Sequence, residues 1–466
     1  MVSATLHFPT AARVGAGRAV SSPLRAQRLD YTPIQPPGKA SPAFFHTIMT
    51  YPPVSGRISF QYPNFRYFMT ARFLITIARE MQAVAVGWQV YAITHRPLDL
   101  GLVGLAQFLP GVLLFLLAGH TADRLPRQRI LAACCGGFTL CSLGLVALTL
   151  HGISSLWPIY AVLLANGAVR AFNGPAAQAF VPLLVPVEHF PNAVAWSSSV
   201  FMSAVIVGPM IGGPLYGVLG SPVPVYAGAA AATLAALALI AAIRMPADRR
   251  PHPAASLESV LGGLRYIRRT PLVLGAISLD LFAVLLGGAV AMLPVYASDI
   301  LKLGATGLGL LRGAPGAGAL ATAVALAHWP LGRRAGYAML GCVAGFGAFT
   351  IVFGLSRSVP LSLVALAMVG ATDMISVNVR QTMVQLSTPD EMRGRVSAVN
   401  VLFVGASNEL GQFESGIAAQ WFGVVPSVVL GGLGTLGIVA AWTWLFPALR
   451  RVDRLGALTP GKPPND

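Results

Sequence analysis

The sequence predicts an all-α membrane protein whose twelve transmembrane helices form two six-helix bundles. Charged residues make up 10% of the chain and hydrophobic residues 55%, whereas roughly 25% of a soluble domain is charged. Mostly apolar runs of about 20 residues, long enough to cross the ~30 Å hydrocarbon core, recur along the chain. Twelve such runs can be delimited, and a polar segment separates the first six from the last six.

The runs give the expected elements in chain order. The first six spans are expected at 67–94, 99–119, 129–150, 156–178, 194–219 and 223–245, within an N-terminal bundle over 65–246. The linker over 247–270 predicts an amphipathic helix on the membrane surface, because its arginines gather on one side. The last six spans are expected at 272–296, 304–328, 335–355, 359–381, 397–421 and 426–447, within a C-terminal bundle over 271–447.

The two ends of the chain are expected outside the membrane. Residues 1–64 are rich in Pro, Ser, Ala and Arg, with no periodic apolar stripe and no apolar core of a signal peptide. They predict a disordered cytoplasmic leader, and 448–466 a cytoplasmic tail.

The net charge of +16 reports membrane topology. Lys and Arg concentrate on the side of the termini, and the opposite loops carry only Arg96, Lys302 and Arg357. Four more lie inside spans: Arg72, Arg79, Arg170 and Arg312. This asymmetry places both termini in the cytoplasm. The basic surface is expected to meet anionic lipid, and nucleic-acid binding is not expected. A monomer is the expected state.

No enzyme motif is found in the sequence. It contains neither a phosphate-binding loop ending in Lys-Ser or Lys-Thr nor a His-Glu-x-x-His motif. The four cysteines lack the spacing of metal ligands; they are Cys134, Cys135, Cys141 and Cys342. We therefore expect no enzyme activity, no cofactor and no metal site.

The two halves of the chain resemble each other. A shift of 203 residues aligns four identities at corresponding positions, namely Gly167 with Gly370, Pro186 with Pro389, Glu188 with Glu391, and Gly213 with Gly416. Internal repeats of this kind place the substrate site between the halves, near the bilayer midplane.

A charged turn follows the second span. Its key residues are Gly119, Asp123, Arg124, Arg127 and Arg129. Twelve spans with this spacing resemble the major facilitator superfamily, although Pro126 stands where the family usually has Gly. The resemblance implies a latch at the cytoplasmic gate. Its expected contact is the start of span eleven near Arg393 and Arg395, where Asp123 would meet a helix N-terminus.

The fifth span contains Gly208, Pro209, Gly212 and Gly213. Proline bends a helix, and glycines allow a second helix to pack closely. The pattern resembles the antiporter motif of the superfamily's exporters, which favours export over uptake; a generic kinked span is the alternative.

Charged residues inside spans are the candidates for proton coupling: Arg170, Glu80, Asp280, Asp373 and Glu409. The segment Arg170-Ala-Phe-Asn173-Gly174 resembles the family's Arg-x-x-Gln-Gly motif, with Asn in place of Gln. Arg170 needs a carboxylate partner; Asp373, its counterpart under the shift, and Glu80 are the candidates. Structural ion pairing is the alternative role for each acid.

Span eleven is the most polar. Glu409, Gln412 and Gly416 share one helical face, whereas Glu414 lies about 140° away around the helix, so the two acids should serve different surroundings. One is expected at the cavity and the other at a neighbouring helix near Arg312. The expected substrate cavity comprises Trp88, Tyr91, Gln107, Asn408, Gln412 and Glu414; an interfacial aromatic belt is the alternative for Trp88 and Tyr91.

These segments together resemble the drug:proton antiporter branch of the superfamily over residues 65–450. The resemblance implies an inner-membrane transporter that exports a small organic molecule, siderophore or drug-like, in exchange for protons. Two other readings stay open: an uptake transporter of the same fold, and a non-transporting scaffold or sensor. The sequence does not identify the substrate.

Overall fold

The computed structural model describes residues 56–153, 155–244, 257–329 and 333–458, except for a few side chains within those ranges. Most of the expected leader, residues 247–256 of the linker and the end of the tail lie outside the described residues. Every regular element in the described part of the chain is helical.

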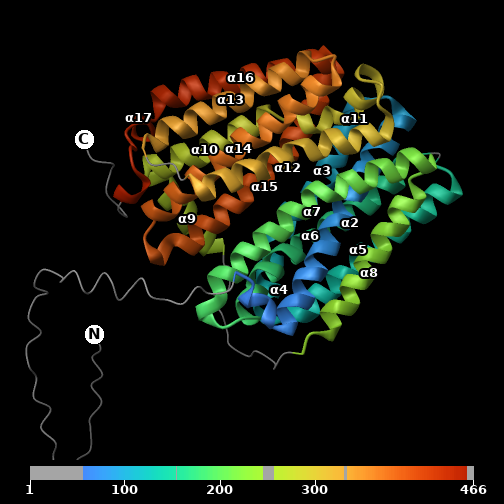
Figure 1. Ribbon diagram of the computed structural model, residues 1–466, viewed down its shortest axis with the longest axis horizontal. Helices are drawn as coiled ribbons and strands as arrows, with labels where there is room; N and C mark the ends of the chain where they lie inside the picture. The colour runs from blue at the N-terminus through green and yellow to red at the C-terminus, as the bar shows by residue number, and fades with distance from the viewer. Residues whose placement is uncertain (1–55, 154, 245–256, 330–332, 459–466) are drawn as a thin grey trace, which may run out of the picture. The chain divides into compact units, whose positions relative to one another are not determined.

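The first group of helices corresponds to the expected N-terminal bundle. It comprises α2 (Pro63–Thr94), α3 (Pro97–Leu113), α4 (Phe115–Arg124), α5 (Arg127–His151), α6 (Trp157–Phe180), α7 (Phe190–Leu219) and α8 (Val223–Ala242). The second expected span is divided at Leu114 into α3 and α4. The helices are coloured blue to green in Figure 1.

The second group corresponds to the expected C-terminal bundle, coloured yellow to red in Figure 1. It comprises α9 (Leu257–Arg269), α10 (Pro271–Leu286), α11 (Leu293–Val295), α12 (Gly304–His328), α13 (Ala335–Leu355), α14 (Val359–Ser387), α15 (Asp390–Phe422), α16 (Val424–Leu445) and α17 (Pro447–Arg450). The linker helix α9 packs against α15 and α10, and the Tyr266 hydroxyl donates to the carbonyl of Ser387 at 2.8 Å.

The seventh expected span is broken where a continuous helix was predicted. α10 ends at Leu286, and a 3₁₀ turn (Ala289–Met292), α11 and a π-helix (Tyr296–Ile300) continue the chain. Two glycines explain the break. A side chain at Gly287 would come within 2.5 Å of Phe346, and one at Gly288 within 2.5 Å of the carbonyl oxygen of Gly411. The backbone therefore leaves the helix at two glycines that lie close against α13 and α15.

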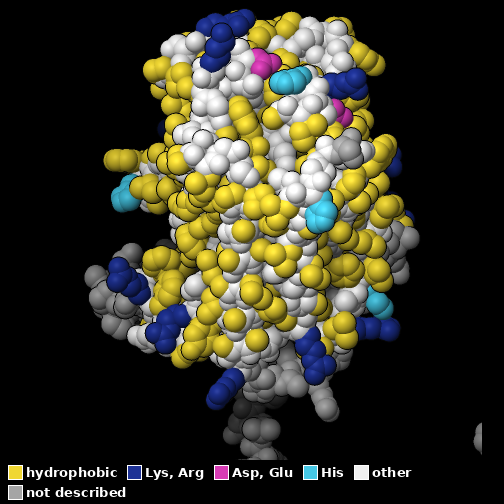
Figure 2. All heavy atoms as spheres, turned by 90° about the vertical axis from the view of Figure 1, so that its right-hand side faces the viewer, with side chains coloured by type: hydrophobic (Ala, Val, Ile, Leu, Met, Phe, Trp, Pro, Cys, Tyr) yellow, Lys and Arg dark blue, Asp and Glu magenta, His cyan; other side chains and the backbone are white. Residues whose placement is uncertain are grey.

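Eight of the described helices are long and apolar enough to cross a membrane. The other four expected spans lie in α2, α3 with α4, α6 and α15; α3 is a shorter apolar helix, and the others carry charged or polar side chains. Figure 2 shows one face of the molecule, where hydrophobic side chains predominate and charged ones gather toward the edges. Such a surface suits a lipid bilayer.

The buried core is divided differently at the two ends of the helices. We call the end where α2 begins and α16 finishes the terminal end, and the opposite end the distal end. At the terminal end each bundle has its own core, around Phe65, Phe138 and Phe180 in one and around Met339, Val379 and Val396 in the other. At the distal end a single core holds residues of both bundles. The bundles are therefore packed together at the distal end.

Candidate functional site

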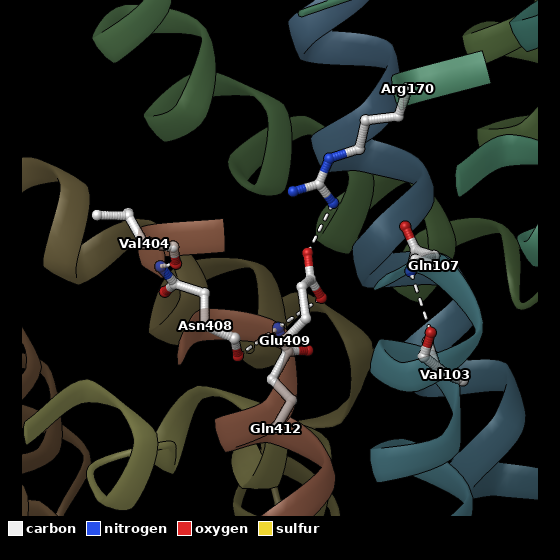
Figure 3. A network of polar contacts seen from close by, with 7 residues as sticks. All are labelled: Val103, Gln107, Arg170, Val404, Asn408, Glu409 and Gln412. Carbon is white, nitrogen blue, oxygen red and sulfur yellow. Dashed lines mark hydrogen bonds and ion pairs between the residues drawn. The ribbon is translucent and has the colours of Figure 1, made fainter. Parts of the chain in front are cut away.

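An ion pair joins the two bundles. Arg170 on α6 and Glu409 on α15 approach to 2.6 Å between Nη1 and Oε1. Gln412, one turn further along α15, donates from Nε2 to the other carboxylate oxygen of Glu409 at 3.2 Å. Figure 3 shows the Arg170 side chain pointing at Glu409 across the gap between their helices. Both oxygens of Glu409 are thus engaged, and one partner belongs to the opposite bundle.

The face of α15 that carries Glu409 is the one that its sequence spacing predicts. A side chain at Gly104 on α3 would lie 3.0 Å from the Cβ of Gln412, and one at Gly416 would lie 2.9 Å from the Cα of Gly101. The positions 409, 412 and 416 therefore all face the N-terminal bundle, and glycines bring α3 and α15 into contact.

Further polar side chains surround the ion pair. Arg79 interacts electrostatically with Arg170, Glu80 and Glu409, although Glu80 is not the ion-pair partner of Arg170. Gln107 of α3 donates to the carbonyl of Val103 on its own helix at 3.5 Å (Figure 3). Charges of both signs thus lie at the junction of the bundles.

The expected pair between Arg170 and Asp373 is not formed. Asp373 lies on α14 inside the C-terminal bundle, where it lines cavities with residues of α10 and α13. The 203-residue shift correctly matches the helices, but it carries no information on which way each side chain points around its helix. Arg170 finds its carboxylate on α15 instead.

A second ion pair lies within the C-terminal bundle. Arg380 of α14 approaches Asp280 of α10 to 2.8 Å, and the two side chains are only 3% and 8% exposed. Arg380 also contacts Asn400 at 3.4 Å. Arg380 was not singled out from sequence, although it falls within the expected span over 359–381. The signal that would have identified it is that α14 continues for seven residues beyond it, to Ser387.

A cavity of about 200 Å³ lies beside this pair. Its polar wall residues include Asp373, Asn408 and Gln412, three of the residues singled out from sequence, together with Thr350. A smaller neighbouring cavity is lined by both Asp373 and Asp280. The structure therefore divides the expected residues between two places, the interface at Glu409 and the cavity at Asp373, and Gln412 contacts both.

The glycine-rich motif of α7 is packed between two helices. Side chains at Gly208 and Gly212 would collide with Glu80 and Met81 of α2, whereas one at Gly213 would come within 2.6 Å of the Cα of Gly309 on α12. In return, Gly309 faces the carbonyl oxygen of Pro209. The motif thus brings α7 against α2 of its own bundle and against α12 of the other.

A polar contact also joins the bundles at the distal end. The Tyr91 hydroxyl of α2 donates to Asp299 in the π-helix, and Trp88 packs against the shared core. Asp299 was missed from sequence because it lies in a loop-like segment after the seventh span. Glu414 accepts a hydrogen bond from Ser415 at 3.3 Å, so it differs in surroundings from Glu409, as the spacing predicts.

The charged turn lies at the terminal end, on α4 and the start of α5. Arg127 donates to the carbonyl of Ala179 on α6 at 2.9 Å, while Arg124 and Arg129 are exposed. At the start of α15, Arg393 pairs with Asp390 at 2.6 Å. The side chain of Asp123 lies outside the described residues, so its latch contact stays a prediction.

The chain matches known transporters over most of its length. The model of the transmembrane secretion effector family matches residues 55–460. The enterobactin exporter EntS of Shigella boydii serotype 4 (strain Sb227) is 30% identical over 402 residues, which is 84% of this chain and 93% of the relative. The EntS of Escherichia coli O1:K1 matches equally.

Solved structures share the fold at low sequence identity. A bacterial homologue of the human lysosomal transporter Spinster, in an inward-facing and occupied conformation, has a TM-score of 0.66 at 14% identity and covers 83% of this chain and 97% of its own. A D-xylose-proton symporter has a TM-score of 0.64 at 13% identity, covering 83% and 98%. The chain therefore belongs to the transmembrane secretion effector family of the major facilitator superfamily, and it is a multi-pass membrane transporter rather than an enzyme.

Proposed function

We propose that the protein exports a small organic molecule, siderophore or drug-like, across the inner membrane in exchange for protons. In this proposal all twelve spans cross the bilayer, both termini lie in the cytoplasm, and the bundles over 65–246 and 271–447 rock against each other. The terminal end then faces the cytoplasm, and the described conformation is closed on the opposite side. The basic last turn of α9, with Arg268 and Arg269, would contact anionic lipid.

The observation that carries the proposal is the ion pair between Arg170 and Glu409. It joins the two moving bodies by charge, next to the close packing of α3 against α15. Protonation of Glu409 would remove its negative charge and leave Arg170 without a counter-ion, which weakens the link between the bundles. Proton uptake would thereby favour separation of α6 from α15, so one proton site could drive a change of conformation.

Two features favour export. The relative at 30% identity carries the name of an exporter, and the glycine motif of α7 resembles that of the superfamily's antiporters. Its packing between α2 and α12 seals the distal end at the level where an outward-open state must part. A transporter in this conformation is ready to load from the terminal end, which suits a substrate made in the cytoplasm.

Proton exchange can be tested in inside-out membrane vesicles. Respiration acidifies their interior and quenches an acridine dye, and a substrate exchanged for protons relieves the quenching. We expect iron-free enterobactin or a panel of amphiphilic drugs to relieve it with the wild-type chain. Glu409→Gln and Asp373→Asn should reduce the response at least about tenfold, whereas Glu391→Gln, which removes an exposed carboxylate on the same helix, should not.

Three outcomes would contradict the proposal. If Glu409→Gln and Asp373→Asn both keep the full response, neither acid is a coupling site. If right-side-out vesicles accumulate the compounds under a proton gradient, the chain is an uptake transporter. A scaffold or sensor would give no compound-dependent proton movement in either orientation.

A further inference from the structure

The cavity beside Asp373 is enclosed by the C-terminal bundle alone. Its walls come from α10, the 3₁₀ turn after it, α12, α13, α14 and α15. It is therefore distinct from the junction of the two bundles, where internal repeats place a central site. Its volume of about 200 Å³ exceeds the ~150 Å³ of an engineered cavity that binds benzene. An aromatic ring with a short substituent would fit.

The charge in its wall is unbalanced. Asp373 is the one ionisable residue among the lining residues, and no hydrogen bond or ion pair to it is found within the described part of the chain. The neighbouring Asp280 and Arg380 neutralise each other at 2.8 Å. One net negative charge remains. Asp373 is partly exposed. Because a carboxylate without a counter-ion in a mostly apolar wall is costly, it favours a cation or a proton.

The rest of the wall also suits a cation. The last turns of α10 contribute Val284, and Gly287 and Gly288 follow directly after the helix. The carbonyls of the two glycines accept hydrogen bonds from Ala289 and Ala291, and the C-terminus of α10 carries the partial negative charge of its helix dipole. Asn408 donates its amide to the carbonyl of Val404, so its side-chain oxygen remains an acceptor.

One partly exposed aromatic ring belongs to the cavity wall. Phe346 and Phe353 both line the cavity, but Phe353 is fully buried and its ring packs on Tyr296. Phe346 is therefore the ring available to attract an organic cation. Lysine and arginine are absent from the residues that line the cavity. The carboxylate, the helix end and the ring of Phe346 thus favour one ligand chemistry, a positively charged group on an apolar body.

We propose that this cavity binds an organic ammonium cation, and that the cation and a proton occupy Asp373 in turn. The inference rests on the proposed proton-coupled export and names a substrate class for it. Binding of the cation releases the proton from the carboxyl group, and departure of the cation lets a proton return. Gln412 lines the cavity and also donates to Glu409. Binding of a cation in the cavity can therefore affect the ion pair between the bundles through this one side chain.

The pH dependence should report Asp373 itself. The charged groups that act on it are Asp280 of α10 and Arg380 of its own helix. The other titratable groups on helices around the cavity line neither cavity; they are Arg312 and His328 of α12, Tyr337 and Cys342 of α13, and Asp390, Glu391, Arg393, Arg395, Glu409 and Glu414 of α15.

The test uses the full-length protein in detergent and phenyltrimethylammonium, a cation that does not titrate. Calorimetric titration should detect binding that weakens as the pH falls, approaching tenfold per pH unit once Asp373 is protonated in the free protein. Heats measured in two buffers of different ionisation enthalpy should reveal about one proton released. tert-Butylbenzene, which has the same shape without charge, should not compete.

Variants separate the carboxylate from general effects. Asp373→Asn should weaken binding at least about tenfold and remove its pH dependence, and Glu391→Gln should change neither. Asp280→Asn should also weaken binding, because Arg380 would lose its partner and its positive charge would then balance the carboxylate of Asp373 in place of the cation. Thermal unfolding of each variant establishes whether it is folded. If Asp373→Asn does not fold, the effect of Asp280→Asn on cation binding tests the inference in its place.

The inference fails if Asp373→Asn binds as the wild type does, if binding is independent of pH, or if Na⁺ at matched ionic strength displaces the cation. Its failure is separate from that of the exporter proposal. Enterobactin-driven proton movement without binding of phenyltrimethylammonium would overturn the inference alone. Binding without any compound-driven proton movement in vesicles would overturn the exporter proposal alone.

Discussion

At the scale of single residues, the buried charges of the C-terminal bundle depend on one another. Asp280 and Arg380 pair directly, and Asp373 interacts electrostatically with both. Removing Arg380 leaves two carboxylates without a counter-ion, whereas removing Asp280 leaves Arg380 with Asp373 still nearby. Loss of Arg380 therefore leaves more unpaired charge inside the bundle than loss of Asp280 does.

We predict that Arg380→Met lowers the free energy of unfolding by about 3–5 kcal/mol, the usual cost of breaking a buried pair from one side. Asp280→Asn should cost less, and the double variant should recover most of the stability. Thermal unfolding of the purified variants measures the order. Equal losses of stability in the two single variants and the double variant would show that the charges of Asp280 and Arg380 do not depend on each other.

Sequence predicted the face of α15 but not the pairing of the acids. The spacing of Glu409, Gln412 and Gly416 is enough to place them on one side of a helix, and they face α3 and α6 as a group. Which acid meets Arg170 depends on how two helices are rotated about their axes. That rotation is set by packing across the whole bundle, and a single sequence does not record it.

At the scale of elements, α7 is positioned by close contacts at its glycines. The motif Gly208 to Gly213 predicted close packing, but its partners α2 and α12 were not predictable, since any helix can approach a glycine face. The break after α10 was missed for a related reason. In the sequence, Gly287 and Gly288 are an ordinary pair of glycines in an apolar span. Their close contacts with Phe346 and Gly411 are visible only in the folded structure.

We predict that Gly213→Ala impairs transport, because a Cβ there would lie 2.6 Å from the Cα of Gly309 and would force α7 and α12 apart. The matched control is Gly437→Ala on α16, where an added Cβ meets nothing within 4 Å. Compound-dependent proton movement in vesicles should fall for the first and persist for the second. A fully active Gly213→Ala would show that the contact is dispensable.

At the scale of the whole molecule, the charge asymmetry of the loops and the twelve expected spans define one topology. Arg96, between α2 and α3, and Arg454, after α17, are both exposed and should lie on opposite sides of the membrane. Their positions test the number of crossings as well as the orientation.

We predict that an impermeant maleimide labels Arg96→Cys in spheroplasts with an intact inner membrane, and Arg454→Cys only after permeabilisation. The background replaces the four native cysteines with alanine. Labelling of Arg454→Cys in intact spheroplasts would invert or break the proposed topology. Labelling of both cysteines without permeabilisation would require an even number of crossings between them, instead of the eleven that the proposed topology has.

If the bundles rock as proposed, the glycine contact between α7 and α12 would act as a fulcrum while the terminal end opens. It lies near the distal end of α7, so the stretch from Phe190 to Gly213, about 35 Å at ~1.5 Å per residue, forms a long lever arm on the terminal side. A rotation of about 10° at the contact would move the Phe190 end by about 6 Å over that length. Small atoms at the fulcrum thus permit a wide opening far away, and the bulk of residue 213 would set how far the arm can swing.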